Sequence, residues 1–203
     1  VAENVDAVRA GLAQQAHSPG GIELSLDTLD HGARQLLQVV DTEHGGLQGA
    51  PKFPQPGLFD FLWRAHLRTG DEALKEAVTL TLDRMAYGGI YDHLGGGFHR
   101  YSTDPQWLVP HFEKMLYDQA LLARAYLEAY QVTGKPAYAD TARDIFEYVL
   151  RDMRDPQGGF HSAEDAGEVG KEGEDYVWTP QEIEHALGAA DATLFNRFYG
   201  VTP

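Results

Sequence analysis

Hydrophobic and polar positions follow the same order twice along the chain: a helical pattern, a short turn, a second helical pattern and a long glycine-rich loop. The first copy spans residues 56–87 and turns at 69–71, and the second spans residues 110–154 and turns at 133–135. Each copy predicts a helical hairpin, because its apolar residues recur at three- and four-residue spacing. All short turns therefore lie at one end of the helices and all long loops at the other, where binding groups are commonly held.

The two helices of a hairpin differ in how much of their surface is apolar. Residues 120–130 carry only two charged side chains, Arg124 and Glu128, which lie four positions apart on one solvated stripe. A helix this apolar is covered on most sides. The following helix has a single apolar face, which includes Ile145 and Met153, and charged residues around the rest. This pattern predicts an inner helix paired with an outer one.

Repeated pairs of inner and outer helices predict an all-α fold, a partial α/α-toroid of helical hairpins with long Gly-rich loops on one face. An α-solenoid of helix pairs is the alternative. The interval from Thr69 to Thr133 favours the toroid, because it exceeds the period of about 34–47 residues in most solenoids. A further helix is expected after Thr179-Pro180, an N-cap and first-position pair. The predicted domains are an N-terminal helix and linker over 1–20 and an incomplete toroid over 21–203.

Composition narrows the classes of function. The net charge of −15 argues against binding to nucleic acid or to anionic membranes, which both need a basic surface. The absence of cysteine from the sequence excludes disulfides, cysteine-bound zinc and redox-active thiols within it. No apolar run is long enough to span a membrane, so a cytoplasmic protein is expected. No cofactor is predicted.

The densest group of chemically reactive side chains lies between residues 88 and 118. Pro110 suits the first position of a helix, which would place His111 and Glu113 in its first turn. There the helix dipole favours a negative group and lowers the pKa of a histidine. Histidine donates or accepts a proton near neutral pH, and a carboxylate can hold its tautomer. The candidate catalytic residues are His99, His111, Glu113 and Asp118.

Other side chains on the same loop face are candidates for contact with a ligand. Tyr101 and Trp107 have flat faces that suit sugar rings. Lys52 lies in a proline-stiffened loop, where it either points into a pocket or is exposed to solvent. The structural alternative for the whole set is that polar side chains satisfy the buried backbone groups of the glycine-rich loops. The candidate ligand-binding residues are Lys52, Phe53, Asp92, Arg100, Tyr101, Trp107, Tyr117, Glu164 and Asp165.

The sequence does not predict a metal site. His99, His111 and Asp118 are suitable types of ligand, but their spacing matches no metal-binding motif. The region that begins at Asp165 does not form an EF-hand, because it lacks oxygen-bearing side chains where calcium would need them. The acidic stretch over 168–175 is expected to be a solvated hairpin.

At these residues the chain resembles a known family. It contains Gly-Ala-Pro-Lys-Phe-Pro at 49–54, Gly-Gly-Gly-Phe-His-Arg-Tyr-Ser at 95–102, Trp-Leu-Val-Pro-His-Phe-Glu-Lys-Met-Leu-Tyr-Asp at 107–118 and Ser-Ala-Glu-Asp-Ala at 162–166. These blocks resemble the thioredoxin-domain-containing YyaL family, which is related to spermatogenesis-associated protein 20. The resemblance implies a thioredoxin-like domain followed by an α/α-toroid similar to N-acylglucosamine 2-epimerases and six-hairpin glycosidases. The chain would be the front half of that toroid, and its partners would be the thioredoxin-like domain and the C-terminal half.

Three functions are compatible with these features. The first is a carbohydrate-active domain, an aldose–ketose isomerase or sugar 2-epimerase, which needs a base and an acid beside a carbonyl. The second is a glycoside hydrolase that uses two carboxylates. The third is a non-catalytic toroid that binds a ligand or presents a client to the thioredoxin-like domain. A small-molecule ligand, a sugar, is expected in the first two, and exposed inner helices would favour a homo-oligomer.

Overall fold

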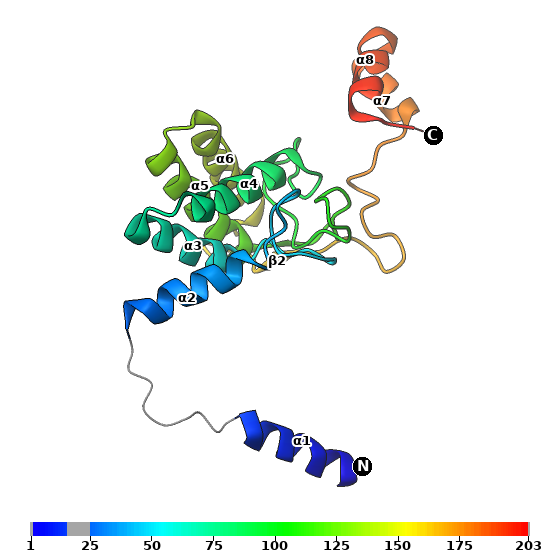
Figure 1. The fold of residues 1–203 in the computed structure, drawn as a ribbon. Coiled ribbons are helices and arrows are strands. Elements are labelled where there is room, and N and C mark those ends of the chain that lie inside the picture. The colour runs from blue at the N-terminus through cyan, green and yellow to red at the C-terminus, as the bar shows by residue number, and fades with distance from the viewer. Residues whose placement is uncertain (1, 16–24, 203) are drawn as a thin grey trace.

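The computed structural model describes residues 2–15 and 25–202, which form a mostly helical structure (Figure 1). Two very short strands, β1 (Lys114–Met115) and β2 (Ala163–Glu164), pair antiparallel. A π-helical turn, η1 (Val149–Met153), follows the sixth helix directly. The α-helices are α1 (Ala2–Gln15), α2 (Leu26–Leu37), α3 (Pro56–Thr69), α4 (Glu72–Tyr87), α5 (Leu116–Thr133), α6 (Pro136–Tyr148), α7 (Pro180–Leu187) and α8 (Ala189–Tyr199).

The two predicted hairpins are α3–α4 and α5–α6, and the predicted fold class is confirmed. Gly70 ends α3 with a φ of 73°, a left-handed conformation that glycine adopts at low cost. The side chain of Asp71 then caps α4 by accepting a hydrogen bond from the amide of Ala73 at 3.1 Å. Gly134 ends α5 in the same way, and Pro136 opens α6. The short turns therefore have the local chemistry that the sequence predicts.

The core lies among α3, α4, α5 and α6. Leu62 of α3, Leu82 of α4 and Ile145 of α6 are buried on the predicted apolar faces. Tyr126 of α5 is also buried, and its hydroxyl donates a hydrogen bond to the carbonyl of Leu82 at 2.8 Å. This bond satisfies a polar group that would otherwise be costly in the core. The inner helix α5 is thus tied to the outer helix of the preceding hairpin.

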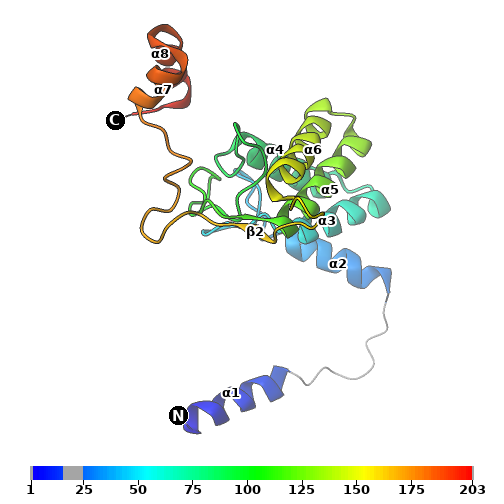
Figure 2. The ribbon, with the colours of Figure 1, turned by 180° about the vertical axis from the view of Figure 1, so that it is seen from behind.

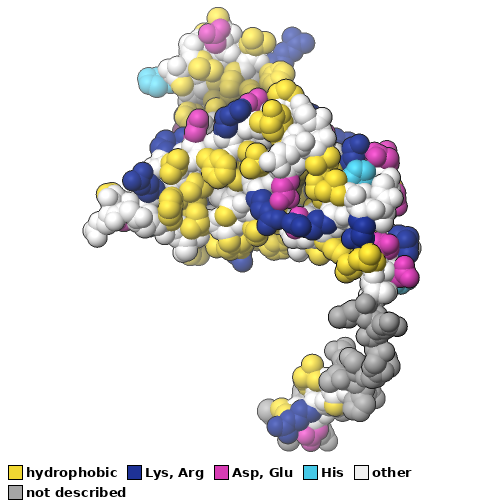
Figure 3. All heavy atoms as spheres, turned by 90° about the vertical axis from the view of Figure 1, so that its left-hand side faces the viewer, with side chains coloured by type: hydrophobic (Ala, Val, Ile, Leu, Met, Phe, Trp, Pro, Cys, Tyr) yellow, Lys and Arg dark blue, Asp and Glu magenta, His cyan; other side chains and the backbone are white. Residues whose placement is uncertain are grey.

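One side of α3 and α5 is exposed, as the sequence predicts for the inner helices of an incomplete toroid. Leu67 of α3 and Leu121, Leu127 and Tyr130 of α5 are exposed. Figure 3 views the molecule from the left-hand side of Figure 1 and shows broad apolar patches interrupted by charged side chains. An open stretch of toroid wall has this mixed surface, because the faces of its inner helices have no neighbour.

The terminal helices stand apart from this body in both ribbon views (Figures 1 and 2). A capping box opens α7, in which Thr179 and Glu182 bond each other's backbone amides. Ile183 is buried, but in the part of the chain described here α7 and α8 pack chiefly on each other. The expected linker and the predicted domain boundary after residue 20 lie outside the described residues.

The prediction that a helix begins at Pro110 is wrong, since α5 begins at Leu116. Residues 110–115 are not helical, and Phe112 among them has a left-handed backbone with a φ of 66°, because the segment pairs with distant parts of the chain. The amide of Arg100 donates to the carbonyl of Glu113 at 2.7 Å, and the amide of His111 donates to the carbonyl of Tyr101 at 3.0 Å. These long-range bonds replace the helical ones.

Gln119 in the first turns of α5 holds the glycine-rich loop through its side-chain amide. Its Oε1 accepts from the amide of Phe98 at 2.8 Å, and its Nε2 donates to the carbonyl of the same residue at 2.6 Å. The side chain is completely buried. Both hydrogen-bonding groups of Phe98 therefore depend on one glutamine.

We predict that Gln119→Leu lowers the free energy of unfolding by about 2–4 kcal/mol, because it leaves two buried backbone groups without partners. The matched control is Gln131→Leu on the exposed face of the same helix, which should change stability by about 0.5 kcal/mol or less. Urea denaturation of both variants measures the difference. Equal stabilities of the two variants would contradict this role of Gln119.

Candidate functional site

A hollow of about 370 Å³ lies where the long loops meet the first turns of α3 and α5. Both helices begin at this hollow, so the positive ends of two helix dipoles lie beside it. Its floor and walls combine aromatic, proline and acidic side chains. The lining residues are Phe53, Pro54, Gln55, Pro56, Gly57, Leu58, Tyr117, Asp118 and Leu121.

A cluster of polar and aromatic side chains adjoins the hollow, and we call Arg100, Tyr101, His111 and Glu113 the rim cluster. The ring of Tyr101 stacks on His111 with centroids 4.7 Å apart. The same tyrosine contacts Phe53, a lining residue, with centroids 4.8 Å apart. Arg100 Nη1 donates to Glu113 Oε2 at 2.9 Å. The non-helical backbone of residues 110–115 thus brings together side chains that a helix would have separated.

The two carboxyl groups of the site have opposite pKa shifts. Burial raises the pKa of Asp118 to about 6, and the positive charge of Arg100 offsets only part of this effect. The hydrogen bond from Arg100 lowers the pKa of Glu113, with burial acting in the opposite direction. Asp118 therefore changes its protonation state near neutral pH, whereas Glu113 stays ionised.

Three buried polar atoms around the hollow have no hydrogen-bond partner within the described residues: Arg100 Nε, His111 Nδ1 and Asp118 Oδ2. His111 Nδ1 lies 3.3 Å from Glu113 Oε2, within ion-pair distance but without hydrogen-bond alignment. Buried polar atoms in folded proteins nearly always have partners. Arg100 Nε is a donor, His111 Nδ1 donates or accepts according to its tautomer, and Asp118 Oδ2 is an acceptor. All three lie just below the surface, so a molecule in the hollow reaches them only when neighbouring side chains shift.

The opposite face of the segment 110–115 is built into the protein interior. The ring of Phe112 packs there against His99 and Tyr176, and Lys114 is buried there. Lys114 Nζ donates to Asp92 Oδ2 at 2.7 Å and lies 4.4 Å from the ring centroid of Tyr148. Burial would raise the pKa of Asp92, but the bonds from Lys114 and from backbone amides outweigh it and lower the pKa.

His99 and Glu164 belong to this buried side rather than to the hollow. The ring of His99 packs edge-on against Phe112 and Tyr176. Burial, reinforced by the charge of Lys114, lowers the pKa of His99 to about 4, so the ring is neutral at physiological pH. Glu164 accepts hydrogen bonds from the hydroxyls of Tyr148 at 2.6 Å and Tyr176 at 2.7 Å. These bonds attach β2 to the helical body.

Lys52 and Trp107 are enclosed, and neither alternative expected for Lys52 applies. Lys52 Nζ donates to Asp41 Oδ2 at 2.7 Å and to the carbonyl of Gly45 at 2.8 Å, and its side chain has no exposed surface. Trp107 is also fully buried, and its indole nitrogen donates to the carbonyl of His44 at 2.8 Å. Both side chains hold the first glycine-rich loop through these hydrogen bonds and are not available to a ligand.

Lys52 and Lys114 hold two different glycine-rich loops in the same way. Lys52 bonds Asp41 and the carbonyl of Gly45, and Lys114 bonds Asp92 and the carbonyl of Gly96 at 3.0 Å. In each loop the other aspartate oxygen accepts two backbone amides. The sequence does not mark Lys114 as a functional residue, because a lysine within an expected helix usually lies in solvent.

Asp165 lies on the exposed side of the loop after β2. Its Oδ1 accepts a hydrogen bond from the amide of Ala166 at 2.7 Å. It is not among the residues that line the hollow. Of the predicted ligand-binding set, the structure brings Phe53, Arg100, Tyr101 and Tyr117 to the hollow or its rim.

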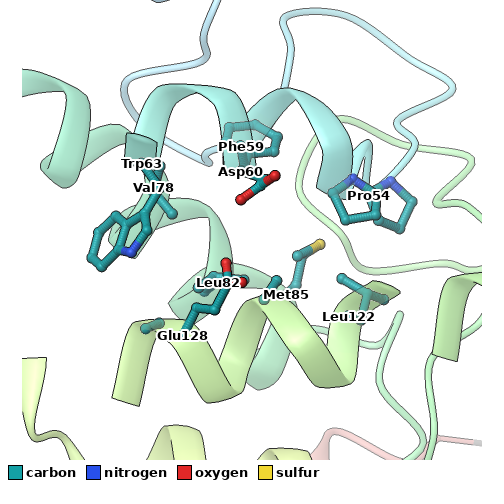
Figure 4. A pocket seen from close by; sticks show the side chains of 12 residues that line it. Pro54, Phe59, Asp60, Trp63, Val78, Leu82, Met85, Leu122 and Glu128 are labelled. Atoms are coloured by element: carbon teal, nitrogen blue, oxygen red, sulfur yellow. The ribbon is translucent and has the colours of Figure 1, made fainter. Parts of the chain in front are cut away.

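A second, apolar cleft lies between α3, α4 and α5 (Figure 4). Phe59, Trp63 and Leu82 line it, with Asp60 and Glu128 among its few polar residues. Its volume is about 20 Å³, against about 370 Å³ for the hollow. This cleft is a seam in the core and is too small for a ligand.

Metal-binding clusters and membrane-spanning helices are both absent from the described residues. Within the described residues, no group of three or more histidine, cysteine, aspartate or glutamate side chains is arranged to hold a metal ion. No helix in residues 2–15 or 25–202 combines the length and apolar character needed to cross a membrane.

The helical hairpins, with their long loops at one end, define an α/α-toroid fold. The chain is similar to cellobiose 2-epimerase from Spirochaeta thermophila, with a TM-score of 0.56 and 22% identity over 68% of this chain and 40% of that one. It is also similar to a D-mannose isomerase, with a TM-score of 0.53 and 18% identity over 68% of this chain and 39% of that one. At these low sequence identities, the structural similarity shows only that the chain shares the fold of these proteins.

Sequence similarity identifies the family within this class. Spermatogenesis-associated protein 20 from Homo sapiens is 48% identical over 83% of this chain and 24% of its own length. The chain belongs to the spermatogenesis-associated protein 20 family. It spans about a quarter of the length of the curated relatives that it matches. No family model matches the chain.

We predict that Lys52→Met lowers the free energy of unfolding by about 3–5 kcal/mol, because it leaves the largely buried carboxylate of Asp41 without its partner. The matched control is Lys75→Met, which removes an exposed pair with Glu72 and should cost about 1 kcal/mol or less. Chemical denaturation near neutral pH measures both. A Lys52→Met variant as stable as its control would show that the ion pair does not hold the loop.

We also predict that Asp118→Asn becomes more stable relative to the parent as pH rises. Folding raises the pKa of Asp118 from its ordinary value of 3.8 to about 6, so folding favours the protonated form. Its stabilising contribution is complete below about pH 4 and is lost as pH rises through about 6. The difference in unfolding free energy should move by about 2–3 kcal/mol in favour of the variant.

Unfolding curves at about pH 4 and pH 8 test this change, with Asp140→Asn on the exposed face of α6 as the control. The control should show little change between the two pH values. A difference between parent and Asp118→Asn that is independent of pH would mean that burial does not shift this carboxyl.

Proposed function

We propose that this chain forms the substrate-binding wall of a sugar-converting enzyme, an aldose–ketose isomerase or sugar 2-epimerase, with the sugar in the hollow beside Asp118. The observation that carries the proposal is the set of unpartnered polar atoms on Arg100, His111 and Asp118. A polyhydroxylated ligand supplies hydroxyl groups that both donate and accept hydrogen bonds, so it can satisfy all three atoms.

Asp118 is the proposed base. Above about pH 6 its carboxylate takes the proton from the carbon next to the carbonyl of an open-chain sugar. The electron pair of that C–H bond moves toward the carbonyl oxygen and forms an enediolate, whose negative oxygen Arg100 stabilises. Return of the proton to the former carbonyl carbon, with transfer of the hydroxyl proton from the neighbouring oxygen to the enediolate oxygen, gives the isomer. Return to the opposite face of the original carbon, from a second acid, gives the epimer.

The size and walls of the hollow support this assignment. Its volume of about 370 Å³ lies within the range of small-molecule pockets, about 300–1,000 Å³. Phe53 and Tyr117 offer partly exposed rings at its edge, which suit the apolar faces of a sugar. Solved structures of this fold include proteins named as a cellobiose 2-epimerase and a D-mannose isomerase. The second proton-transfer group would come from the rest of the toroid.

The opposite pKa shifts of Asp118 and Glu113 favour glycoside hydrolysis as the second candidate. A glycosidase pairs a carboxyl group that is protonated near neutral pH with one that is ionised. Asp118 and Glu113 have these two states. Arg100 already engages Glu113, however, which makes its carboxylate a poor nucleophile for this reaction.

We predict that the full-length protein exchanges the proton next to the carbonyl of at least one neutral sugar when it is incubated with a panel of aldoses and ketoses in deuterated water. Asp118→Asn should slow this exchange by at least about 100-fold, because it removes the base. Asp140→Asn, which changes an exposed aspartate of α6, is the control and should keep the parent's rate. Proton NMR of the sugars measures the incorporation of deuterium.

The outcomes separate the candidates. Exchange that survives in Asp118→Asn would remove Asp118 from the reaction. Release of the aglycone from aryl glycosides, without exchange, would favour hydrolysis. A full-length protein that binds sugars but neither exchanges nor hydrolyses them would be a binding module.

A further inference from the structure

Two positive groups at the hollow are already balanced by carboxylates. Arg100 carries the only full positive charge of the rim cluster, and Glu113 bonds it at 2.9 Å. The N-terminus of α5 contributes a partial positive charge, and Asp118 lies in its first turn. Arg100 and the N-terminus of α5 therefore each have a negative neighbour before a ligand arrives, whereas the first turn of α3 contains no acidic residue.

A third carboxylate belongs to the acidic stretch 168–175. Backbone hydrogen bonds lower the pKa of the exposed Glu172, and His111 contributes a smaller effect in the same direction. The carboxylates at the rim and hollow thus come from two separate elements, the segment 110–115 and helix α5, and the loop after β2 adds a weaker, more distant negative charge. The net charge of −15 on the whole chain adds a long-range field of the same sign.

This arrangement suits a ligand without charge. A phosphate or carboxylate in the hollow would face Asp118 and Glu113, and like charges in a partly buried site repel strongly. A hydroxyl group can donate to the Asp118 carboxylate and accept from Arg100 Nε without adding charge. A neutral polyol can therefore form hydrogen bonds with the atoms that lack partners without charge repulsion from Asp118 and Glu113.

We propose that the hollow selects uncharged sugars over phosphorylated or acidic ones, and that Glu113 determines this selectivity by neutralising Arg100. The inference rests on the proposed function, because it names the substrate class of the same site. Glu113→Gln keeps the length and shape of the side chain but removes its charge. Arg100 is then free to attract an anion.

The experiment measures the binding of mannose, its phosphate monoester and the matching uronic acid to the full-length protein by saturation-transfer NMR and calorimetry. We expect mannose to bind at least about 10-fold more tightly than either anion at low salt. In Glu113→Gln this gap should shrink by about 10-fold or reverse. The matched control is Glu76→Gln on outer helix α4, which removes the same charge far from the hollow and should leave the gap unchanged.

A second measurement needs no variant. Salt screens repulsion between charges, so raising ionic strength should bring the affinity for the anions closer to that for mannose. Anions that bind as tightly as mannose, or more tightly, would overturn the inference and leave the proposed function intact. A protein that binds no sugar of either kind would overturn both.

Discussion

The pairing of the segment 110–115 with the backbone of residues 100–102 is the constraint on which the site depends. It delays the start of α5 and gives the segment two faces. His111 and Glu113 turn toward the hollow, while Phe112 and Lys114 turn into the interior. A helix over the same residues would rotate each side chain by about 100° from the last and scatter these groups. The non-helical backbone of this segment therefore separates the solvent-facing rim cluster from the buried side chains behind it.

Buried ion pairs between lysine and aspartate hold the glycine-rich loops behind the rim cluster. Lys52 and Lys114 each join an aspartate to a glycine carbonyl of a different loop. Buried ion pairs of this kind specify one arrangement, because breaking either partner leaves a charge without compensation. Gly97 completes the second loop: with a φ of 79°, a Cβ there would lie 2.5 Å from the ring of Tyr148. The loops are therefore rigid parts of the scaffold.

Local patterns predicted the hairpins well and the loops poorly. Apolar spacing identified the faces of α3 to α6, and the turn residues at 69–71 and 133–135 identified where those helices end. The start of α5 was missed because the competing bonds come from residues far away in the sequence. Lys52, Trp107 and His99 belong to the predicted site residues but lie inside the protein. Composition alone does not show which polar side chains face inward. Arg100, His111, Glu113 and Asp118 do come together, although the first three lie on irregular loop segments and only Asp118 lies on a helix.

The proposed function requires that the unpartnered atoms of Arg100, His111 and Asp118 form hydrogen bonds with the hydroxyl groups of a ligand. A crystal structure of the full-length protein soaked with mannitol, an uncharged open-chain polyol, tests it most directly. We expect hydroxyl oxygens about 2.6–3.2 Å from Asp118 Oδ2 and Arg100 Nε. A hollow that is filled by another part of the protein, or polyol bound elsewhere while these atoms stay unpartnered, would contradict it.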